Sequence, residues 1–276
     1  MHYSINNFYK PHTTDEAISI FEKNPDKSVF LSGGTNLAKN NLSRYDTIID
    51  IKSNFKSSIV NSENFFEISA CTSLQEVLEN VDLNDYFDGF FKKYFQMIGS
   101  WQIRNMATLG GSIASRVGWS DVISLLLLLR TEVKIVNKNE KKWIKLEDLN
   151  KGMKKGHIIE KIRIMKNGSK YGYKRFSRTE FDIGLLNCGV TLKLDDNKIK
   201  DIKVVFGSVP VAGKRYTEIE NALRGEEIYE AIEISPELVN EMFDGKASPF
   251  ISREYRFELA KVFLSELLME LAGVKL

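Results

Sequence analysis

The stretch FLSGGTNLAK, residues 30–39, places two adjacent glycines after an apolar, strand-like segment, and ATLGGSIAS, residues 107–115, repeats that arrangement. Glycine has no Cβ, so successive backbone N–H groups can point into one concavity and approach a phosphate closely. Hydroxyl side chains that can donate to phosphate oxygens flank both pairs: Ser32, Thr35, Thr108 and Ser112. Two such loops suit a pyrophosphate. Gly-Gly is also a common turn signal, so spacing alone leaves both interpretations open.

Composition excludes several classes of protein. The chain has 276 residues, enough for one large domain or two to three smaller ones. Its formal net charge of +2 gives no reason to expect nucleic acid as a partner. The most apolar run, VISLLLLL at 122–129, is far shorter than the ~20 residues of a membrane span, and the N-terminus shows no signal-peptide pattern. We therefore expect a cytoplasmic protein with neither a nucleic-acid nor a membrane partner.

Residues that commonly bind metals or act as nucleophiles are scarce. The three histidines form no H-E-x-x-H motif or Cys/His cluster. Cys71 and Cys188 lie far apart, which implies neither a disulfide framework nor an iron–sulfur motif. No G-x-S-x-G, Walker loop or G-x-G-x-x-G occurs. We predict no metal site and assign no catalytic side chain, so a bound cofactor would supply most of the chemistry of an enzyme.

The apolar pattern predicts an alternation of helices and strands. Thr13 and Glu16 fit a capping box at the first helix, and Ser73 or Thr72 fits the N-cap of another. A single helix with aromatic core residues is predicted over 83–99, and a buried helix over 121–130. Strand-like segments occupy 28–34, 46–51, 64–73, 132–137, 141–149 and 157–165.

The amino-acid composition changes near the segment 165–175, which is polar and rich in Gly and Lys. Beyond it, NCGVTLKLDDNKIKDIKVVFGSV predicts two strands joined by an Asp-Asn turn. The last ~60 residues read as helical, with 252–271 as the clearest helix and Ser252 as its N-cap.

Several segments together resemble one known family. FYKPHTTDEAISIF, LSGGTNL, IGSWQIRNMATLGGSIAS and DVISLLLLL are similar to the FAD-binding subunit, or medium subunit, of the molybdenum hydroxylases, the relatives of xanthine dehydrogenase and carbon monoxide dehydrogenase. YKRFSRTEFDIGLLNCGVTLKL resembles that family's K-x-x-x-R-x-x-x-D-I-A segment, and SREYRFELAKVFL resembles its C-terminal E-Y-R helix. The similarity covers nearly the whole chain in the same order, and the string from Gln102 to Gly111 is its most specific part.

The resemblance implies an α+β fold. Its first part is a para-cresol methylhydroxylase-type FAD-binding domain of two α/β subdomains, residues 1–55 and 56–167. Residues 168–276 form a C-terminal domain with a three-stranded antiparallel sheet and helices.

The resemblance also implies a set of FAD-binding residues. In the family the two Gly-Gly loops cradle the FAD pyrophosphate. The corresponding residues here are Leu31, Ser32, Gly33, Gly34, Thr35, Asn36 and Leu37 in the first loop and Thr108, Gly110, Gly111 and Ser112 in the second, with Ile98 and Ser115 completing this part of the set.

Three further residues have two interpretations each. Asp121 corresponds to the family's acidic residue on the FAD ribose side, and it also suits the N-cap of the 122–130 helix. Lys174 corresponds to a lysine near the isoalloxazine ring, where a cation favours the reduced flavin, or it is an ordinary solvated lysine. Arg104 either offsets anionic charge or holds the loop through backbone carbonyls, and we favour the structural role.

The chain departs from the family pattern next to these residues. Asn36 stands where the family often has Asp. In SRVGWSD, Ser115 replaces an Asn and Gly118 replaces a Pro, while Arg116 and Trp119 are additions. The resemblance places this segment against the cofactor, so these differences bear on its shape and on access to the flavin.

The implied function is electron transfer by an oxidoreductase subunit. The chain would bind FAD, accept electrons from the iron–sulfur subunit of a complex and pass them to an acceptor such as NAD or oxygen. A molybdopterin-binding subunit would carry out the hydroxylation, since this chain has neither cluster-binding nor molybdopterin-binding residues. Two alternatives remain at this point: a free-standing flavin-dependent oxidoreductase, and a scaffold subunit that has lost flavin, which the altered 115–120 segment suggests.

Overall fold

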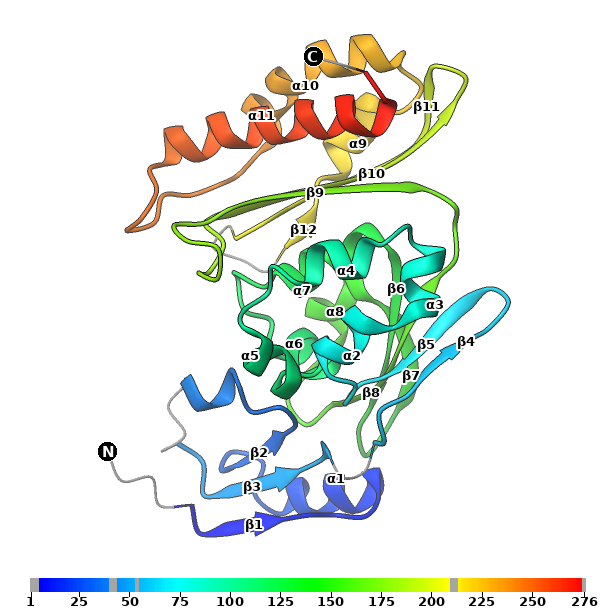
Figure 1. Ribbon diagram of the computed structural model, residues 1–276. Coiled ribbons are helices and arrows are strands. Elements are labelled where there is room, and N and C mark those ends of the chain that lie inside the picture. The colour runs from blue at the N-terminus through cyan, green and yellow to red at the C-terminus, as the bar shows by residue number, and fades with distance from the viewer. Residues whose placement is uncertain (1–4, 40–43, 53–54, 209–212, 275–276) are drawn as a thin grey trace. The chain divides into compact units, whose positions relative to one another are not determined.

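The computed structural model describes residues 5–39, 44–52, 55–208 and 213–274 (Figure 1). The chain forms two compact units. The first unit contains Met1–Gln96, Ser100–Ser115 and Thr131–Lys166, and the second contains Met97–Gly99, Arg116–Arg130 and Asn167–Leu276. The division into domains at residues 55 and 167 stays a prediction.

A small parallel sheet begins the first unit. Its order is β1-β3-β2, with β1 (Asn7–Tyr9), β2 (Ser28–Leu31) and β3 (Thr47–Asp50), and α1 (Thr14–Lys23) packs against it. Thr13 is the N-cap of α1, as predicted, because its side chain accepts from the Glu16 amide. The Glu16 carboxylate also accepts from the His12 amide at 2.7 Å.

The first unit also contains a five-stranded sheet and six helices of the described chain. Its order is β4-β5-β8-β6-β7, with β4 (Ile59–Asn61), β5 (Phe65–Ser69), β6 (Arg130–Val136), β7 (Lys141–Lys145) and β8 (Ile158–Met165). The helices of this unit are α2 (Leu74–Glu79), α3 (Val81–Tyr86), α4 (Phe90–Phe95), α5 (Trp101–Met106), α6 (Leu109–Ser115) and α8 (Leu149–Gly152). Ser73 caps α2 with a complete capping box to Glu76. The strand predicted over 141–149 ends at Lys145, where a 3-10 turn, Leu146–Asp148, leads into α8.

The single helix predicted over 83–99 is wrong. The chain breaks between α3 and α4 because Asp88 and Gly89 have positive φ angles of 50° and 71°, outside the helical region. The Asn84 side chain stabilises the break, since it donates to the Leu78 carbonyl and accepts from the Lys92 amide, both at 2.8 Å. The aromatic residues are core, as predicted: Phe87, Phe90, Phe91 and Phe95 are each at most 2% exposed.

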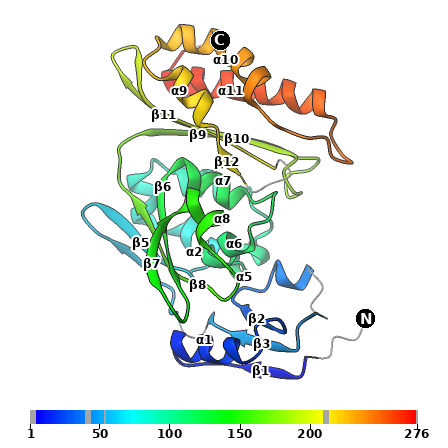
Figure 2. The same ribbon diagram turned by 180° about the vertical axis from the view of Figure 1, so that it is seen from behind.

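The second unit is built on an antiparallel sheet in the order β12-β11-β10-β9. Three long strands confirm the predicted C-terminal sheet, and a two-residue strand is added at one edge: β9 (Lys170–Phe176), β10 (Leu186–Asp195), β11 (Lys198–Gly207) and β12 (Lys214–Arg215). The helices α9 (Thr217–Leu223), α10 (Ile228–Met242) and α11 (Arg253–Ala272) lie on one face, and α7 (Asp121–Leu128) lies on the other (Figures 1 and 2). Ser252 caps α11, as predicted. Within the described ranges, no helix is long and apolar enough to cross a membrane.

Side chains from the sheet complete the C-terminal end of α7. The last carbonyls of a helix have no partner within it, and here they are buried. The Lys203 ammonium donates to the carbonyls of Leu127 and Leu129 at 3.4 and 3.0 Å, and the Thr191 hydroxyl donates to the Leu128 carbonyl at 2.8 Å. Both side chains are buried, so these bonds fix α7 to β10 and β11.

We predict that Lys203→Met lowers the free energy of unfolding by about 1–3 kcal/mol, because it leaves buried carbonyls without a donor. Urea unfolding measures this loss. Lys200→Met is the matched control: its ion pair with Asp195 joins side chains that are 57% and 70% exposed, so its loss should cost less than about 0.5 kcal/mol. Equal stability of the two variants would contradict the role given to Lys203.

Candidate functional site

The first Gly-Gly pair follows β2 directly. Gly34 has a φ of +72°, which L side chains rarely adopt. The Gly34 carbonyl accepts from the Ala38 amide at 2.9 Å, so the chain turns at once into the 3-10 turn Leu37–Lys39. The residues from Leu31 to Leu37 are all half-buried and thus partly open to solvent.

Gly33 is the point at which this loop meets a distant segment of the first unit. A Cβ on Gly33 would lie 2.1 Å from the Met106 carbonyl oxygen and 3.0 Å from the Ala107 Cα. These neighbours are backbone atoms, so no side-chain rotation could relieve the clash. Glycine is therefore required for the contact between the first loop and the segment that precedes the second Gly-Gly pair.

The second Gly-Gly pair lies in the first turn of α6 rather than in an open loop. The Leu109 and Gly110 amides donate to the carbonyls of Thr72 and Ala70 at 2.9 and 2.8 Å. The Gly111 amide donates to Thr108 Oγ1 at 3.1 Å. These amides already have acceptors within the chain, which the sequence hypothesis of two equivalent phosphate loops did not anticipate.

Side chains link the two pairs. Ser32 Oγ lies 2.9 Å from Thr108 Oγ1 and 3.3 Å from Cys71 Sγ. Thr108 and Cys71 are buried. The two glycine pairs thus meet in one place in the first unit, and Cys71, which the sequence did not assign to the site, lies beside them.

Three amides of the first loop differ from those of α6. Within the part of the chain that the structure describes, the N–H groups of Gly33, Gly34 and Thr35 have no hydrogen-bond acceptor. Successive unpaired N–H groups in a turn form a concavity that binds anions. The first loop is therefore the part of the predicted site that is chemically open to a phosphate group.

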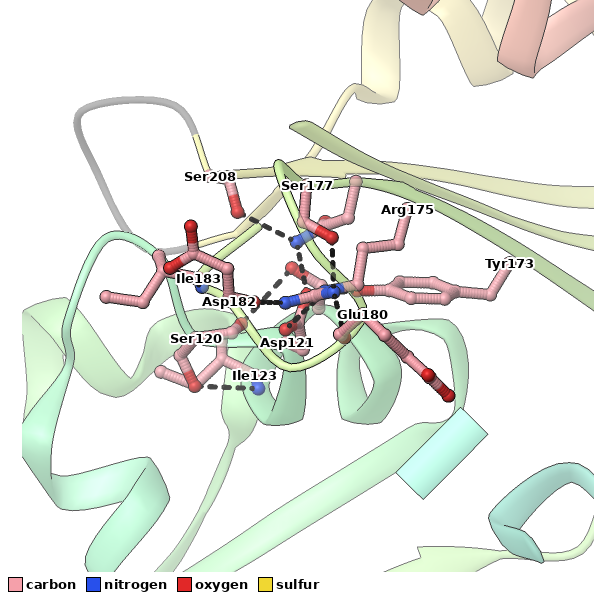
Figure 3. Close-up of polar contacts among 12 residues, drawn as sticks. Ser120, Asp121, Ile123, Tyr173, Arg175, Ser177, Glu180, Asp182, Ile183 and Ser208 are labelled. Carbon is pink, nitrogen blue, oxygen red and sulfur yellow. Dashed lines mark hydrogen bonds and ion pairs between the residues drawn. The ribbon is translucent and has the colours of Figure 1, made fainter. Parts of the chain in front are cut away.

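Asp121 lies in the second unit, and its carboxylate is buried and bonded within the chain. Oδ1 accepts from the Tyr173 hydroxyl at 2.6 Å, and Oδ2 accepts from Arg175 Nε at 3.1 Å (Figure 3). Oδ1 also accepts from Asn187 Nδ2 at 3.0 Å. Burial, and next the Asp121 charge, hold the pKa of Tyr173 well above its ordinary value, so the phenol stays a donor. Asp121 is not the N-cap of α7, because Ser120 fills that position and accepts from the Ile123 amide.

Arg175 extends this network into the loop after β9. Its NH1 group donates to Ser177 Oγ at 2.9 Å and to the Glu180 carbonyl at 3.3 Å, and its NH2 group donates to the Asp182 carbonyl (Figure 3). The Arg175 and Asp121 side chains are only 6% and 8% exposed. One buried ion pair therefore holds α7, β9 and the loop that follows β9.

Lys174 faces the other side of the sheet. Its ammonium lies 2.8 Å from a Glu266 carboxylate oxygen and 2.5 Å from one of Glu270, both on α11. Burial acts to lower the pKa of Lys174, but the two carboxylates outweigh it and raise that pKa above its ordinary value. Lys174 is thus neither a freely solvated lysine nor adjacent to Asp121, and its predicted place at the flavin stays untested.

The remaining predicted residues have local contacts. Ser115 donates to the Ser112 carbonyl, and Ser112 donates to the Thr108 carbonyl, both at 2.9 Å within α6. Arg104 donates to Gln75 Oε1 at 2.8 Å and to the Gln96 carbonyl at 3.0 Å. These bonds join segments of the chain, which agrees with the structural role favoured for Arg104. Arg116 has a φ of 46°, so the altered 115–120 segment begins with a turn of left-handed backbone. Ile98 lies in the second unit, in the link between α4 and α5.

Among the described residues, no group of three or more His, Cys, Asp or Glu side chains is placed to hold a metal ion.

An α+β fold whose two glycine pairs meet in one place is consistent with a nucleotide-binding protein, and comparison with known families identifies the class. Residues 3–165 match the model of the FAD binding domain in molybdopterin dehydrogenase, and residues 171–271 match that of the CO dehydrogenase flavoprotein C-terminal domain. The chain belongs to this family: it is an FAD-binding, medium-type subunit of the molybdenum hydroxylases and an oxidoreductase flavoprotein.

Individual proteins agree with this assignment. The chain is 27% identical to the glyceraldehyde dehydrogenase medium chain of Sulfolobus acidocaldarius, over 96% of this chain and 98% of that one. It is 28% identical to the nicotine 6-hydroxylase medium subunit of Paenarthrobacter nicotinovorans, over 63% of each chain. A reconstituted CO dehydrogenase structure from Oligotropha carboxidovorans matches with a TM-score of 0.90 at 18% identity, covering 100% of both chains, which supports the predicted fold.

The first loop passes a test for the cofactor of this family. FAD carries an anionic pyrophosphate, which needs close backbone approach and N–H donors. Gly33 allows a close backbone approach, Gly34 supplies a left-handed turn, and the amides of Gly33, Gly34 and Thr35, which have no acceptor among the described residues, would be the donors. The loop therefore fits the pyrophosphate of FAD.

Asp121→Asn separates a structural role from a cofactor role. We predict a loss of about 3–5 kcal/mol in the unfolding free energy of the apoprotein, because the variant leaves the buried Arg175 guanidinium without its carboxylate. Urea unfolding without flavin measures this quantity. Asp182→Asn is the control, since its ion pair with Arg178 joins more exposed side chains and should contribute less than about 1 kcal/mol. If Asp121→Asn instead left stability unchanged and weakened FAD binding, Asp121 would be a cofactor ligand.

Proposed function

We propose that the chain is the electron-transfer subunit of a molybdenum hydroxylase complex. It holds FAD, receives electrons from an iron–sulfur subunit and delivers them to an acceptor such as NAD or oxygen. A molybdopterin-binding subunit performs the substrate oxidation. The single observation that carries this proposal is the family match over both halves of the chain.

Within this proposal, the first unit holds the pyrophosphate. The amides of Gly33, Gly34 and Thr35 donate to its oxygens, and Gly33 brings the loop against the 106–107 backbone so that the cradle keeps its shape. Residues Leu31 to Leu37 thus form the principal contact, and Thr108, Gly110, Gly111 and Ser112 support it from the side of α6. When bound, FAD supplies the redox chemistry, since it takes up two electrons and can release them one at a time.

The need for partner subunits follows from what the chain lacks. Its two cysteines, Cys71 and Cys188, are both buried and far apart in sequence, so they cannot ligate an iron–sulfur cluster. The names of the relatives, medium chain and medium subunit, describe parts of multi-subunit enzymes. Both observations support the proposal that electrons reach this chain from another protein.

Reduction of the isolated chain tests the electron-transfer role. The purified chain loaded with one equivalent of FAD should lose its visible flavin absorption on addition of dithionite. It should keep that absorption with an aldehyde or a purine, because the substrate-oxidising centre lies on another subunit. Anaerobic absorption spectroscopy records both results. Bleaching by the aldehyde or the purine in the absence of other subunits would overturn the assignment.

Gly34→Val tests the loop directly. The φ of +72° disfavours a β-branched residue, so the loop should rearrange and the purified variant should retain less than about a tenth of the wild-type flavin. Gly225→Val is the matched control, because Gly225 has a comparable φ of +89° with open space around it and lies in the second unit. Flavin content per chain, measured after denaturation, should fall for the first variant alone. Full flavin content in Gly34→Val would refute the role of the first loop.

A further inference from the structure

A continuous series of hydrogen bonds runs beside the two glycine pairs. It begins at the Gly111 amide, passes through the hydroxyls of Thr108 and Ser32 and the thiol of Cys71, and ends at the Ile51 carbonyl. The successive distances are 3.1, 2.9, 3.3 and 3.8 Å, the last two of which involve the larger sulfur atom. The series thus connects α6, the first loop and the segment after β3.

The donors in this series can be assigned. The Gly111 amide can only donate, so Thr108 Oγ1 accepts from it and has its own proton left for Ser32. At the other end the Cys71 thiol donates to Ile51, so its sulfur is an acceptor for the Ser32 proton. Burial raises the pKa of the Cys71 thiol, which keeps the proton on sulfur. In this arrangement every proton has an acceptor.

The two hydroxyls are both engaged within the chain. If the Ser32 and Thr108 protons are both directed along the series, neither is available to a phosphate oxygen. The sequence hypothesis treated these hydroxyls as phosphate donors. Their contacts show that they join chain segments, while the neighbouring amides of Gly33, Gly34 and Thr35 have no acceptor among the described residues.

We propose that Ser32, Cys71 and Thr108 are positioning residues that hold the first loop in its pyrophosphate-binding shape before FAD arrives. This inference rests on the proposed function. A loop held in its bound conformation loses less conformational freedom on binding, so the ligand binds more tightly. Without the series, the loop would lose its side-chain bonds to the 71 and 108 positions, and the ligand would have to align the three amides.

The experiment titrates FAD into the apoprotein of the wild type and its variants and follows flavin fluorescence. Urea unfolding without flavin is measured in parallel. Thr108→Val removes the hydroxyl at nearly constant shape, and Ser32→Ala removes the centre of the series. Each should raise the Kd for FAD about ten-fold, the effect of one lost hydrogen bond on a binding equilibrium.

Two readouts separate positioning from a general loss of stability. Thr108→Ser keeps the hydroxyl and should bind FAD within about two-fold of the wild type. The double variant Ser32→Ala/Thr108→Val should bind no more weakly than about the worse single variant, because both changes break one series. Thr47→Val is the control: it removes another buried hydroxyl of the first unit and should leave the Kd unchanged whatever it does to unfolding.

The outcomes distinguish the two proposals. Wild-type affinity in folded Thr108→Val and Ser32→Ala would overturn the positioning role and leave FAD binding intact. Effects that add fully in the double variant would also overturn it, since they would indicate two independent contacts with FAD. A folded wild-type apoprotein that does not bind FAD would overturn the proposed function, and this inference with it. If Thr108→Val does not fold, Ser32→Ala and Thr108→Ser decide the question.

Discussion

The close approach of Gly33 to the Met106 carbonyl is the constraint on which the proposed cofactor site depends. A single methyl group at this position would lie 2.1 Å from the carbonyl oxygen, so no other residue permits the contact. The contact brings the loop after β2 to the start of α6, 76 positions apart at the Ser32–Thr108 bond. Once the backbones meet, the hydroxyls and the Cys71 thiol can bond, while the amides of Gly33, Gly34 and Thr35 have no acceptor among the described residues.

The second unit depends on buried ionic contacts between its sheet and α7. Its sheet must carry helices on both faces, and α7, buried along its whole length, covers the face opposite α11. Two buried cations hold this arrangement: Lys203 at the C-terminal end of α7 and Arg175 at its first residue, Asp121. Arg175 also orders the loop after β9 (Figure 3). The conformation of that loop therefore depends on a carboxylate supplied by α7.

Much of the fold could be predicted because its signals are local. Thr13, Ser73 and Ser252 cap helices where the sequence places them, and apolar alternation locates the long C-terminal strands. The prediction of one helix over 83–99 was wrong because two positive-φ residues and the Asn84 side chain break the helix despite the helical spacing of its aromatic residues. At the site, residue types and spacing identified the glycine pairs. They could not reveal that Asp121 bonds Arg175 or that Lys174 bonds Glu266, since those partners lie 54 to 92 positions away and are set by tertiary packing.

Hydrogen–deuterium exchange of the apoprotein with and without FAD tests the central claim most directly, because it reads the backbone amides themselves. The account predicts that FAD slows exchange in the peptide covering residues 31–37, where Gly33, Gly34 and Thr35 have no acceptor among the described residues. Exchange at the start of α6 should change much less, since its amides are already bonded. Bound FAD that leaves the exchange of residues 31–37 unchanged would contradict the claim that this loop holds the pyrophosphate.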